Sequence, residues 1–163
     1  MIALAPIGFW HPLRGRCAAA ILRHSATLSR AMPGRGRRRL LRSRFGRTLS
    51  LFPFSARPGS VGVDEAVTLA TTLAHSDIAA MSRYTGRYRF RGSGPIGAPV
   101  TLVWAGRDRL LGRVDARRAA QRLPHALQVL IPGSGHRLAT DAPDEITSLV
   151  LRATGCGHRK SNY

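Results

Sequence analysis

Apolar residues are arranged along this chain in two patterns. Short continuous runs occupy positions 2–5, 99–106 and 127–131, and each run ends at glycine or proline. Parallel strands that are covered on both faces have this form, whereas half-exposed strands alternate apolar and polar residues. The first pattern therefore predicts three buried strands, one at the start of the chain and two near its end.

The second pattern is an apolar repeat every three or four residues, which is typical of helices that pack on a core. It predicts a helix over about 13–32, with Cys17, Ile21, Leu28 and Met32 on its buried side and the residues "MPG" closing it. A further helix is expected to begin near Asp64, because a carboxylate suits a helix N-terminus. Its expected buried stripe consists of Val67, Ala70, Ala74, Ile78 and Met81.

A basic amphipathic helix is predicted between these two, in "RRRLLRSRFGRTLSLF" at residues 37–52. Arginines occupy most of its faces, and its apolar stripe consists of Leu41, Phe45, Leu49 and Phe52. One interpretation is a helix that binds nucleic acid or anionic lipid. We favour a helix that packs its apolar stripe on a core, because Gly46 weakens the helix and no aromatic residues are interleaved for base stacking.

The last third of the chain alternates strands and helices with short connections. The strand at 99–106 is followed by a helix at 114–123, the strand at 127–131 and a helix at 141–154 that has Pro143 near its first turn. Such an order predicts parallel strands joined by a right-handed crossover. The two strands should then be neighbours in one sheet, about 5 Å apart.

Two residues with catalytic chemistry follow the ends of these two strands. Asp108 comes after the first strand and His136 after the second, on the glycine turn "PGSGH". Because the carboxyl ends of parallel strands meet at one rim of a sheet, we expect both side chains to lie there and to touch. An Asp in that place can hold an imidazole in one tautomer and stabilise it when it takes a proton. Taken alone, Asp108 could cap a turn and His136 could be a structural loop residue. Only the two together favour a catalytic role.

Composition and charge narrow the function classes. With 163 residues, 44% of them hydrophobic, the chain can bury the core of one domain and is not disordered. Its formal net charge is +18, almost all from arginine, with Lys160 the single lysine. GC-rich codons that fill solvated positions with arginine explain this better than a dedicated nucleic-acid surface does. The alternative is an Arg-rich basic module, residues 14–47, that binds nucleic acid or anionic membrane.

The sequence does not support a metal site, a disulfide framework or a membrane span. Cys17 and Cys156 lie far apart without metal-ligand spacing, so neither a metal site nor a disulfide framework is predicted, and no cofactor is expected. No apolar run approaches the roughly 20 residues of a membrane span, and the apolar N-terminus lacks the charged start of a signal peptide. We therefore expect no membrane span and a cytoplasmic location.

The stretch "PVTLVWAGRDRLL", followed by "LIPGSGHRLATDAPDEI", resembles the C-terminal half of the α/β-hydrolase family. The N-terminal "ALAPIGFW" resembles the strand that follows the nucleophile helix in that family. The resemblance implies an incomplete α/β-hydrolase fold, an α/β fold of about three parallel strands with flanking helices and an inserted helical lid. It divides the chain into a core strand (1–10), a lid (11–95), a C-terminal α/β core (96–155) and a polar tail (156–163). It implies that Asp108 is the triad acid and His136 the general base.

The family's nucleophile is a serine in G-x-S-x-G, and no such pentapeptide precedes Asp108. Ser60 in "RPGSVG" lacks the first glycine and a preceding buried strand, and Ser134 is better interpreted as a turn residue. The resemblance thus implies a hydrolase of small ester-like or other organic substrates that is inactive in this half alone.

The expected partners are a small-molecule substrate in the complete enzyme, and either a complementary N-terminal half or a second copy at the open edge of strand 2–5. A nucleic-acid partner is not expected. A start codon placed too late and a gene remnant are further explanations of the absent half.

Overall fold

The computed structural model describes residues 1–92 and 96–154, and its core is a three-stranded parallel sheet in the order β1-β2-β3. The strands are β1 (Ile2–Leu4), β2 (Thr101–Ala105) and β3 (Leu127–Ile131). β2 is the central strand, with Thr101 opposite both Ile2 and Leu127. The three strands expected from the apolar runs are therefore present, in parallel pairing. The polar tail expected at 156–163 and Cys156 lie outside the described residues.

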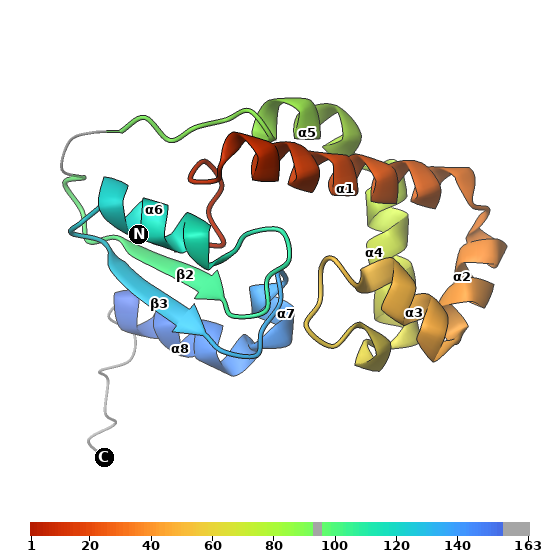
Figure 1. Cartoon of the computed structure of the whole chain (residues 1–163). Helices are drawn as coiled ribbons and strands as arrows, with labels where there is room; N and C mark the ends of the chain where they lie inside the picture. The colour runs from red at the N-terminus through yellow and green to blue at the C-terminus, as the bar shows by residue number, and fades with distance from the viewer. Residues whose placement is uncertain (93–95, 155–163) are drawn as a thin grey trace, which may run out of the picture.

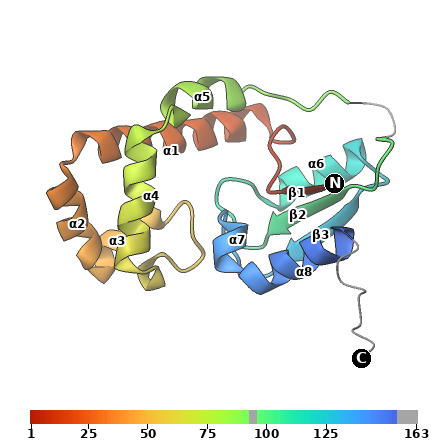
Figure 2. The same cartoon turned by 180° about the vertical axis from the view of Figure 1, so that it is seen from behind.

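Helices cover both faces of the sheet (Figures 1 and 2). One face packs against α6 (Arg113–Arg122), and its buried cluster includes Leu102, Trp104 and Ala119. The other face packs against α7 (Leu138–Asp141) and α8 (Pro143–Thr154), with Val103 and Ile131 in its cluster. Successive residues of β2 thus point into two separate apolar layers, which is why the whole strand is apolar.

A helical region is inserted between β1 and β2 (Figure 1). It consists of α1 (Pro12–Ala31), α2 (Gly34–Arg42), α3 (Arg44–Leu51), a short 3-10 turn (Pro58–Ser60), α4 (Val63–His75) and α5 (Ile78–Thr85). The long helix α1 leads away from the sheet, and α5 packs alongside it. The loop after α3 turns back toward α7, so the far end of the helical region touches the core again.

The packing of α1 on α5 depends on glycine. A side chain at Gly15 of α1 would lie 2.5 Å from the carbonyl oxygen of Gly86, and one at Gly86 would lie 2.8 Å from the Cβ of Ala19. The two backbones therefore approach more closely than larger residues would allow. The buried side of α1 consists of Gly15, Ala18, Ala19 and Ala26.

This arrangement corrects the stripe predicted for the first helix. Cys17 is exposed, and Leu28 is 51% exposed. The helix repeat identified an amphipathic segment, but small residues are buried where the partner helix comes close. Of the larger residues in the predicted stripe, Leu28 is left outside, whereas Ile21 is partly buried and packs against the core cluster.

The prediction of a single helix over 37–52 is also wrong, because the helix is interrupted at Ser43, between α2 and α3. The Ser43 hydroxyl accepts a hydrogen bond from the backbone N–H of Gly46 at 2.9 Å, as an N-cap does. A side chain at Gly46 would collide with the carbonyl of Leu40, so the turn also requires that glycine. The helix expected from Asp64 to about 81 is broken in the same way, at Ser76 and Asp77 between α4 and α5.

The break changes which apolar residues are covered. Leu41 is buried, but Phe45, Leu49 and Phe52 are 76%, 65% and 52% exposed. The expected packing of the whole stripe on a core is therefore incorrect for the described residues.

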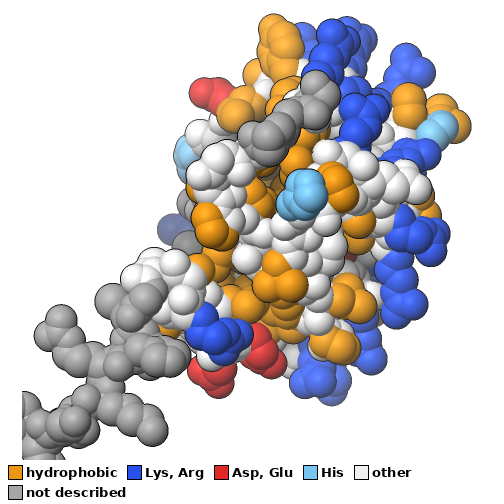
Figure 3. Space-filling view, turned by 90° about the vertical axis from the view of Figure 1, so that its left-hand side faces the viewer, with side chains coloured by type: hydrophobic (Ala, Val, Ile, Leu, Met, Phe, Trp, Pro, Cys, Tyr) orange, Lys and Arg blue, Asp and Glu red, His pale blue; other side chains and the backbone are white. Residues whose placement is uncertain are grey.

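Part of the core surface is open as well. β1 pairs with β2 along one edge, and its other edge has no partner strand within residues 1–92 and 96–154. Met1, Leu4 and Ile7 are exposed around it. Seen from the end of the core that points away from the helical region, hydrophobic side chains gather in the middle of the face and basic side chains line one margin (Figure 3).

Candidate active site

Asp108 lies just beyond the carboxyl end of the central strand. Its Oδ1 accepts hydrogen bonds from the backbone N–H groups of Leu110 at 2.7 Å and Leu111 at 2.9 Å. Both leucines are buried, which anchors the turn, and the Asp108 side chain is only 1% exposed. One carboxylate oxygen is thus used to fix the turn, and Oδ2 is left to face the neighbouring loop.

His136 lies beyond the end of β3, on a turn whose shape comes from two of its residues. Gly133 has a φ of +83°, a conformation that glycine adopts without strain. The buried Ser134 hydroxyl donates to the carbonyl of Ile131 at 2.8 Å, and the N–H of Arg107 donates to the Ser134 carbonyl at 2.8 Å. The loops after β2 and β3 are therefore fastened together beside the strand ends.

The structure brings the two side chains into contact. His136 Nδ1 lies 2.9 Å from Asp108 Oδ2. Because a carboxylate only accepts hydrogen bonds, Nδ1 carries a proton, and Nε2 is an acceptor whenever the ring is neutral. Nε2 has no hydrogen-bond partner in the part of the chain that is described, and the side chain is 30% exposed. The arrangement can take up a proton at Nε2 and stabilise the cation that results.

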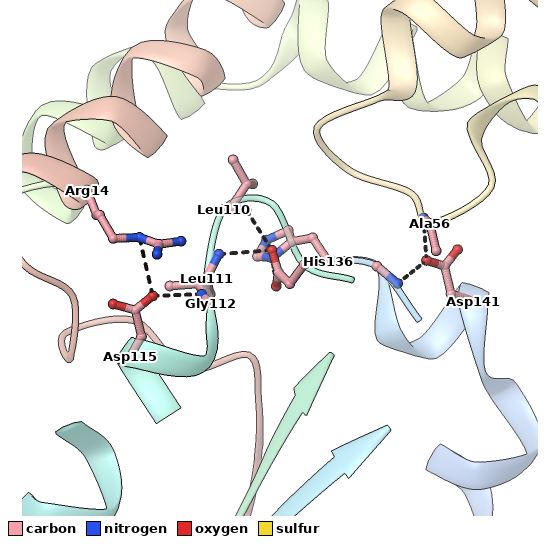
Figure 4. A network of polar contacts seen from close by, with 10 residues as sticks. Arg14, Ala56, Leu110, Leu111, Gly112, Asp115, His136 and Asp141 are labelled. Atoms are coloured by element: carbon pink, nitrogen blue, oxygen red, sulfur yellow. Dashed lines mark hydrogen bonds and ion pairs between the residues drawn. The ribbon is translucent and has the colours of Figure 1, made fainter. Parts of the chain in front are cut away.

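A second carboxylate supports the acid loop from below (Figure 4). Asp115 is fully buried, and its Oδ2 accepts the backbone N–H of Gly112 at 2.7 Å and lies 3.7 Å from Arg14 Nε of α1. The start of α6 is thereby tied to the start of the helical region. Sequence reasoning missed this residue, although an acid at the third position of a helix is a known capping signal.

The loop after α3, residues 52–57, is held against the two loops that carry Asp108 and His136. Arg109 Nη1 donates to the carbonyls of Phe52 and Ser55, both at 2.8 Å, and the N–H of Arg137 donates to the carbonyl of Phe54 at 3.2 Å. Arg137 Nη2 also reaches Glu65 Oε1 of α4 at 2.6 Å. The residue after the aspartate and the residue after the histidine therefore both bind the helical region.

Neither candidate serine is bonded to His136. The Ser60 hydroxyl donates to the carbonyl of Arg57 at 2.8 Å, and that of Ser134 donates to Ile131. Both hydroxyls are used in their own turns.

An apolar groove of about 770 Å³ lies inside the helical region. It is lined mainly by α1, α2, the end of α3 and α4, including Ile21, Leu28, Leu41, Leu49 and Leu73. Leu49 of the exposed stripe is part of this lining, whereas Phe45 and Phe52 lie outside it.

Several arginines of the basic segment 14–47 bind the protein itself. Arg37 Nη1 donates to the carbonyls of Ser29 and Met32, and Arg30 Nε to that of Ala74. Arg47 caps the end of α2, and Arg38 pairs with Asp64. The Arg30, Arg37 and Arg47 side chains thus serve the helical region itself, whereas the Arg38–Asp64 pair is exposed to solvent.

Comparison with known proteins shows the fold. No family model matches the sequence, and no curated protein sequence resembles it significantly. An α/β-hydrolase enzyme, MGS-M2, from a Medee basin deep-sea metagenome library is 16% identical with a TM-score of 0.66, over 95% of this chain and 55% of its own. Rv0554 from Mycobacterium tuberculosis is 16% identical with a TM-score of 0.61, over 95% and 56%.

A third structure is 2-hydroxy-6-oxo-6-phenylhexa-2,4-dienoate hydrolase from Rhodococcus sp. strain RHA1, 14% identical with a TM-score of 0.51, over 67% of this chain and 44% of its own. The chain thus has part of the α/β-hydrolase fold and spans about half the length of the structures it matches. This confirms the incomplete α/β-hydrolase fold expected from the sequence. No helix of residues 1–92 and 96–154 has the length and apolar character needed to cross a membrane.

Proposed function

We propose that this chain carries the acid and the general base of an α/β-fold hydrolase of the Ser-His-Asp type. The observation that supports this most directly is the 2.9 Å contact between His136 Nδ1 and Asp108 Oδ2, at the rim where two parallel strands end. Asp108 is shielded from water and is held by two backbone N–H groups, so its orientation toward the ring is fixed. Nε2, the atom that would take up the proton, is the ring nitrogen without a hydrogen-bond partner among the described residues, and the side chain is 30% exposed.

In the proposed reaction, Nε2 of His136 takes the proton of a serine hydroxyl while the serine oxygen attacks the substrate carbonyl. The same proton then passes to the leaving oxygen as the bond to carbon breaks. A water molecule repeats the two steps and releases the acid. Asp108 keeps Nε2 oriented and offsets the charge of the imidazolium.

The serine itself is assigned to the part of the fold that this chain does not span. Its G-x-S-x-G turn belongs to the strands that would follow β1 across the sheet. The open edge of β1 offers the backbone hydrogen bonds for such a strand, and we propose it as the joining surface of the complementary half. Self-association at this edge is the competing outcome. Without a serine, the pair alone should lose several orders of magnitude in rate.

A small organic substrate with an apolar acyl or ring portion fits the helical region, which we propose acts as the lid. The 770 Å³ groove is of the size of small-molecule sites, and its lining is predominantly apolar. One structural neighbour, the Rhodococcus protein, is by name a hydrolase of a phenyl-bearing dienoate. The groove and the stripe of Phe45, Leu49 and Phe52 would then form the apolar wall of the substrate site.

The test is to look upstream of Met1 for an open reading frame that encodes a G-x-S-x-G turn, to express it joined to residues 1–163, and to assay p-nitrophenyl esters of increasing acyl length. The extended protein should hydrolyse them, while residues 1–163 alone should not exceed the buffer rate. His136→Ala and Asp108→Asn should each lower kcat at least about a thousandfold, because each removes a member of the proton relay. His125→Ala is the matched control, since His125 is exposed on the turn before β3, and it should leave kcat unchanged.

An extended protein that folds and hydrolyses these esters equally well with and without His136 would refute the proposal. So would a fluorophosphonate probe that labels Ser60 or Ser134 in place of an upstream serine.

A further inference from the structure

Asp141, at the end of α7, binds two loops that are far apart in sequence (Figure 4). Its Oδ2 accepts the backbone N–H of Gly135 at 2.6 Å and that of Ala56 at 3.1 Å. Its Oδ1 accepts the hydroxyl of Ser55 at 3.2 Å. One carboxylate thus joins the residue before His136 to the loop at 52–57.

The three donors to Asp141 are the Ser55 hydroxyl and the backbone N–H groups of Ala56 and Gly135. Ser55 is 1% exposed, and its oxygen in turn accepts the N–H of Arg57 at 3.3 Å. The N–H groups of Gly135 and Ala56 take Asp141 as their partner. Charge-assisted bonds of this kind are stronger than bonds between neutral groups, especially where the carboxylate is half-buried.

Gly135 shows independently that the two loops are pressed together. A side chain there would collide with the backbone nitrogen of Ala56 and would lie 2.7 Å from both Asp141 Oδ2 and the carbonyl carbon of Ser55. The 52–57 loop occupies the space that a Cβ would need. The backbone leading into His136 is therefore set by where that loop lies.

We propose that Asp141 is a positioning residue that fixes the His136 ring against Asp108 by fastening the histidine turn to the helical region. This inference rests on the proposed function, because it assigns a role in orienting the proposed base. Asp141 does not touch His136 and does not act on substrate. It holds the backbone one residue before the ring, at the point from which the direction of the side chain is set.

The second link between these loops is the bond from the Arg137 N–H to the Phe54 carbonyl, on the other side of His136. The histidine is thus flanked by two attachments to the same loop. A displacement of the helical region, as when substrate enters, would be transmitted to the base through both. Of these two attachments to the loop, only that of Asp141 depends on a side chain that substitution can remove; the Arg137 side chain separately binds Glu65 of α4.

The experiment uses the full chain and nuclear magnetic resonance, so it needs no catalytic activity. In the unmodified protein, the Nδ1 proton of His136 should give a downfield signal from its bond to Asp108, and the amides of Gly135 and Ala56 should exchange slowly. In Asp141→Ala both amides should exchange at least about tenfold faster, and the ring proton should broaden or vanish. Asp141→Asn, which keeps one acceptor oxygen, should lie between the two. Asp144→Ala, three residues further on an exposed turn of α8, should leave all three signals unchanged.

The outcomes separate this inference from the proposed function. If the unmodified protein lacks the His136 ring signal, the acid-base pair itself is refuted. If the signal is present and survives in a folded Asp141→Ala protein with normal amide protection, the positioning role is refuted while the pair stands. Should Asp141→Ala fail to fold, Asp141→Asn decides: a ring signal and amide exchange identical to those of the unmodified protein would overturn the inference.

Discussion

The guanidinium carbon of Arg109 lies 3.9 Å from the centre of the Phe52 ring, so the residue next to the candidate acid holds the end of α3. The same side chain donates hydrogen bonds to the carbonyls of Phe52 and Ser55. Arg109, a single residue at the rim of the sheet, thereby anchors the loop at 52–57 of the helical region. Function and stability of this region should therefore depend on residues that carry no chemistry themselves.

Arg109→Ala tests this anchor. Losing the two hydrogen bonds and the cation–π contact should lower the free energy of unfolding by about 1 to 3 kcal/mol, measured in urea. Arg109→Lys should recover only part of that, because an ammonium cannot stack on Phe52 as a planar guanidinium does. The control is Arg107→Ala, whose side chain is exposed. Equal stability of the Arg109→Ala and Arg107→Ala proteins would contradict the anchor.

Gly15→Ala should destabilise the protein although it replaces a glycine within a helix. Such a change ordinarily stabilises a helix by up to about 1 kcal/mol, but here the new Cβ meets the carbonyl of Gly86 at 2.5 Å. Overpacking at a close helix contact should cost about 1 to 3 kcal/mol. In Gly34→Ala the nearest atom would be Arg37 Nη2 at 3.9 Å, so stability should stay the same or rise slightly. Thermal unfolding of both proteins decides, and the same sign in both would refute the close approach of α1 and α5.

Leu102→Ala should be among the most damaging changes in the core. Leu102 is 2% exposed on the central strand, and truncating a buried leucine costs about 2 to 5 kcal/mol. Leu127→Ala, on the neighbouring strand but 61% exposed, should stay within about 0.5 kcal/mol of the unmodified protein. Urea denaturation followed by tryptophan fluorescence measures both. A loss at Leu127 as large as that at Leu102 would show that another chain covers β3 in solution.

Arg37→Ala distinguishes a structural from a nucleic-acid role of the basic segment. Arg37 bonds the carbonyls of Ser29 and Met32 at the end of α1, so its loss should cost about 1 to 2 kcal/mol of stability. Arg39→Ala, on an exposed face of α2, should cost almost nothing. Any binding of a short DNA duplex, measured by fluorescence anisotropy, should be weak and salt-sensitive, and both substitutions should lower it by the same small factor because each removes one positive charge. Tight binding that both substitutions abolish at unchanged stability would support the basic module instead.

The strands and the contact between Asp108 and His136 could be predicted because their signals are local. Each strand is a short apolar run, and the alternation of strand and helix fixes parallel neighbours, which brings residues beyond the two strand ends to one rim. Asp108 and His136 are 28 positions apart, yet this rule needs only the order of elements to place them together.

The helical region could be predicted only in part, because periodicity tells which residues share a face but not what covers it. Phe45 and Leu49 repeat as a buried stripe would, but the break at Ser43 turns α3 so that both are exposed. The break depends on the Ser43 cap and on the close contact at Gly46. Serine and glycine also occur at many positions of this sequence where no helix is interrupted, so neither residue alone predicts the break.

Asp141 and Arg109 left no signal in the sequence for a further reason. Their partners, Ala56 and Phe52, lie 85 and 57 positions away, and those contacts exist because the loop after α3 folds back onto the sheet rim. The apolar pattern and the order of elements depend on residues that are close in sequence, and can therefore be recognised from the sequence alone. A hydrogen bond between remote loops depends on three-dimensional packing, which arises only when every intervening element is in place.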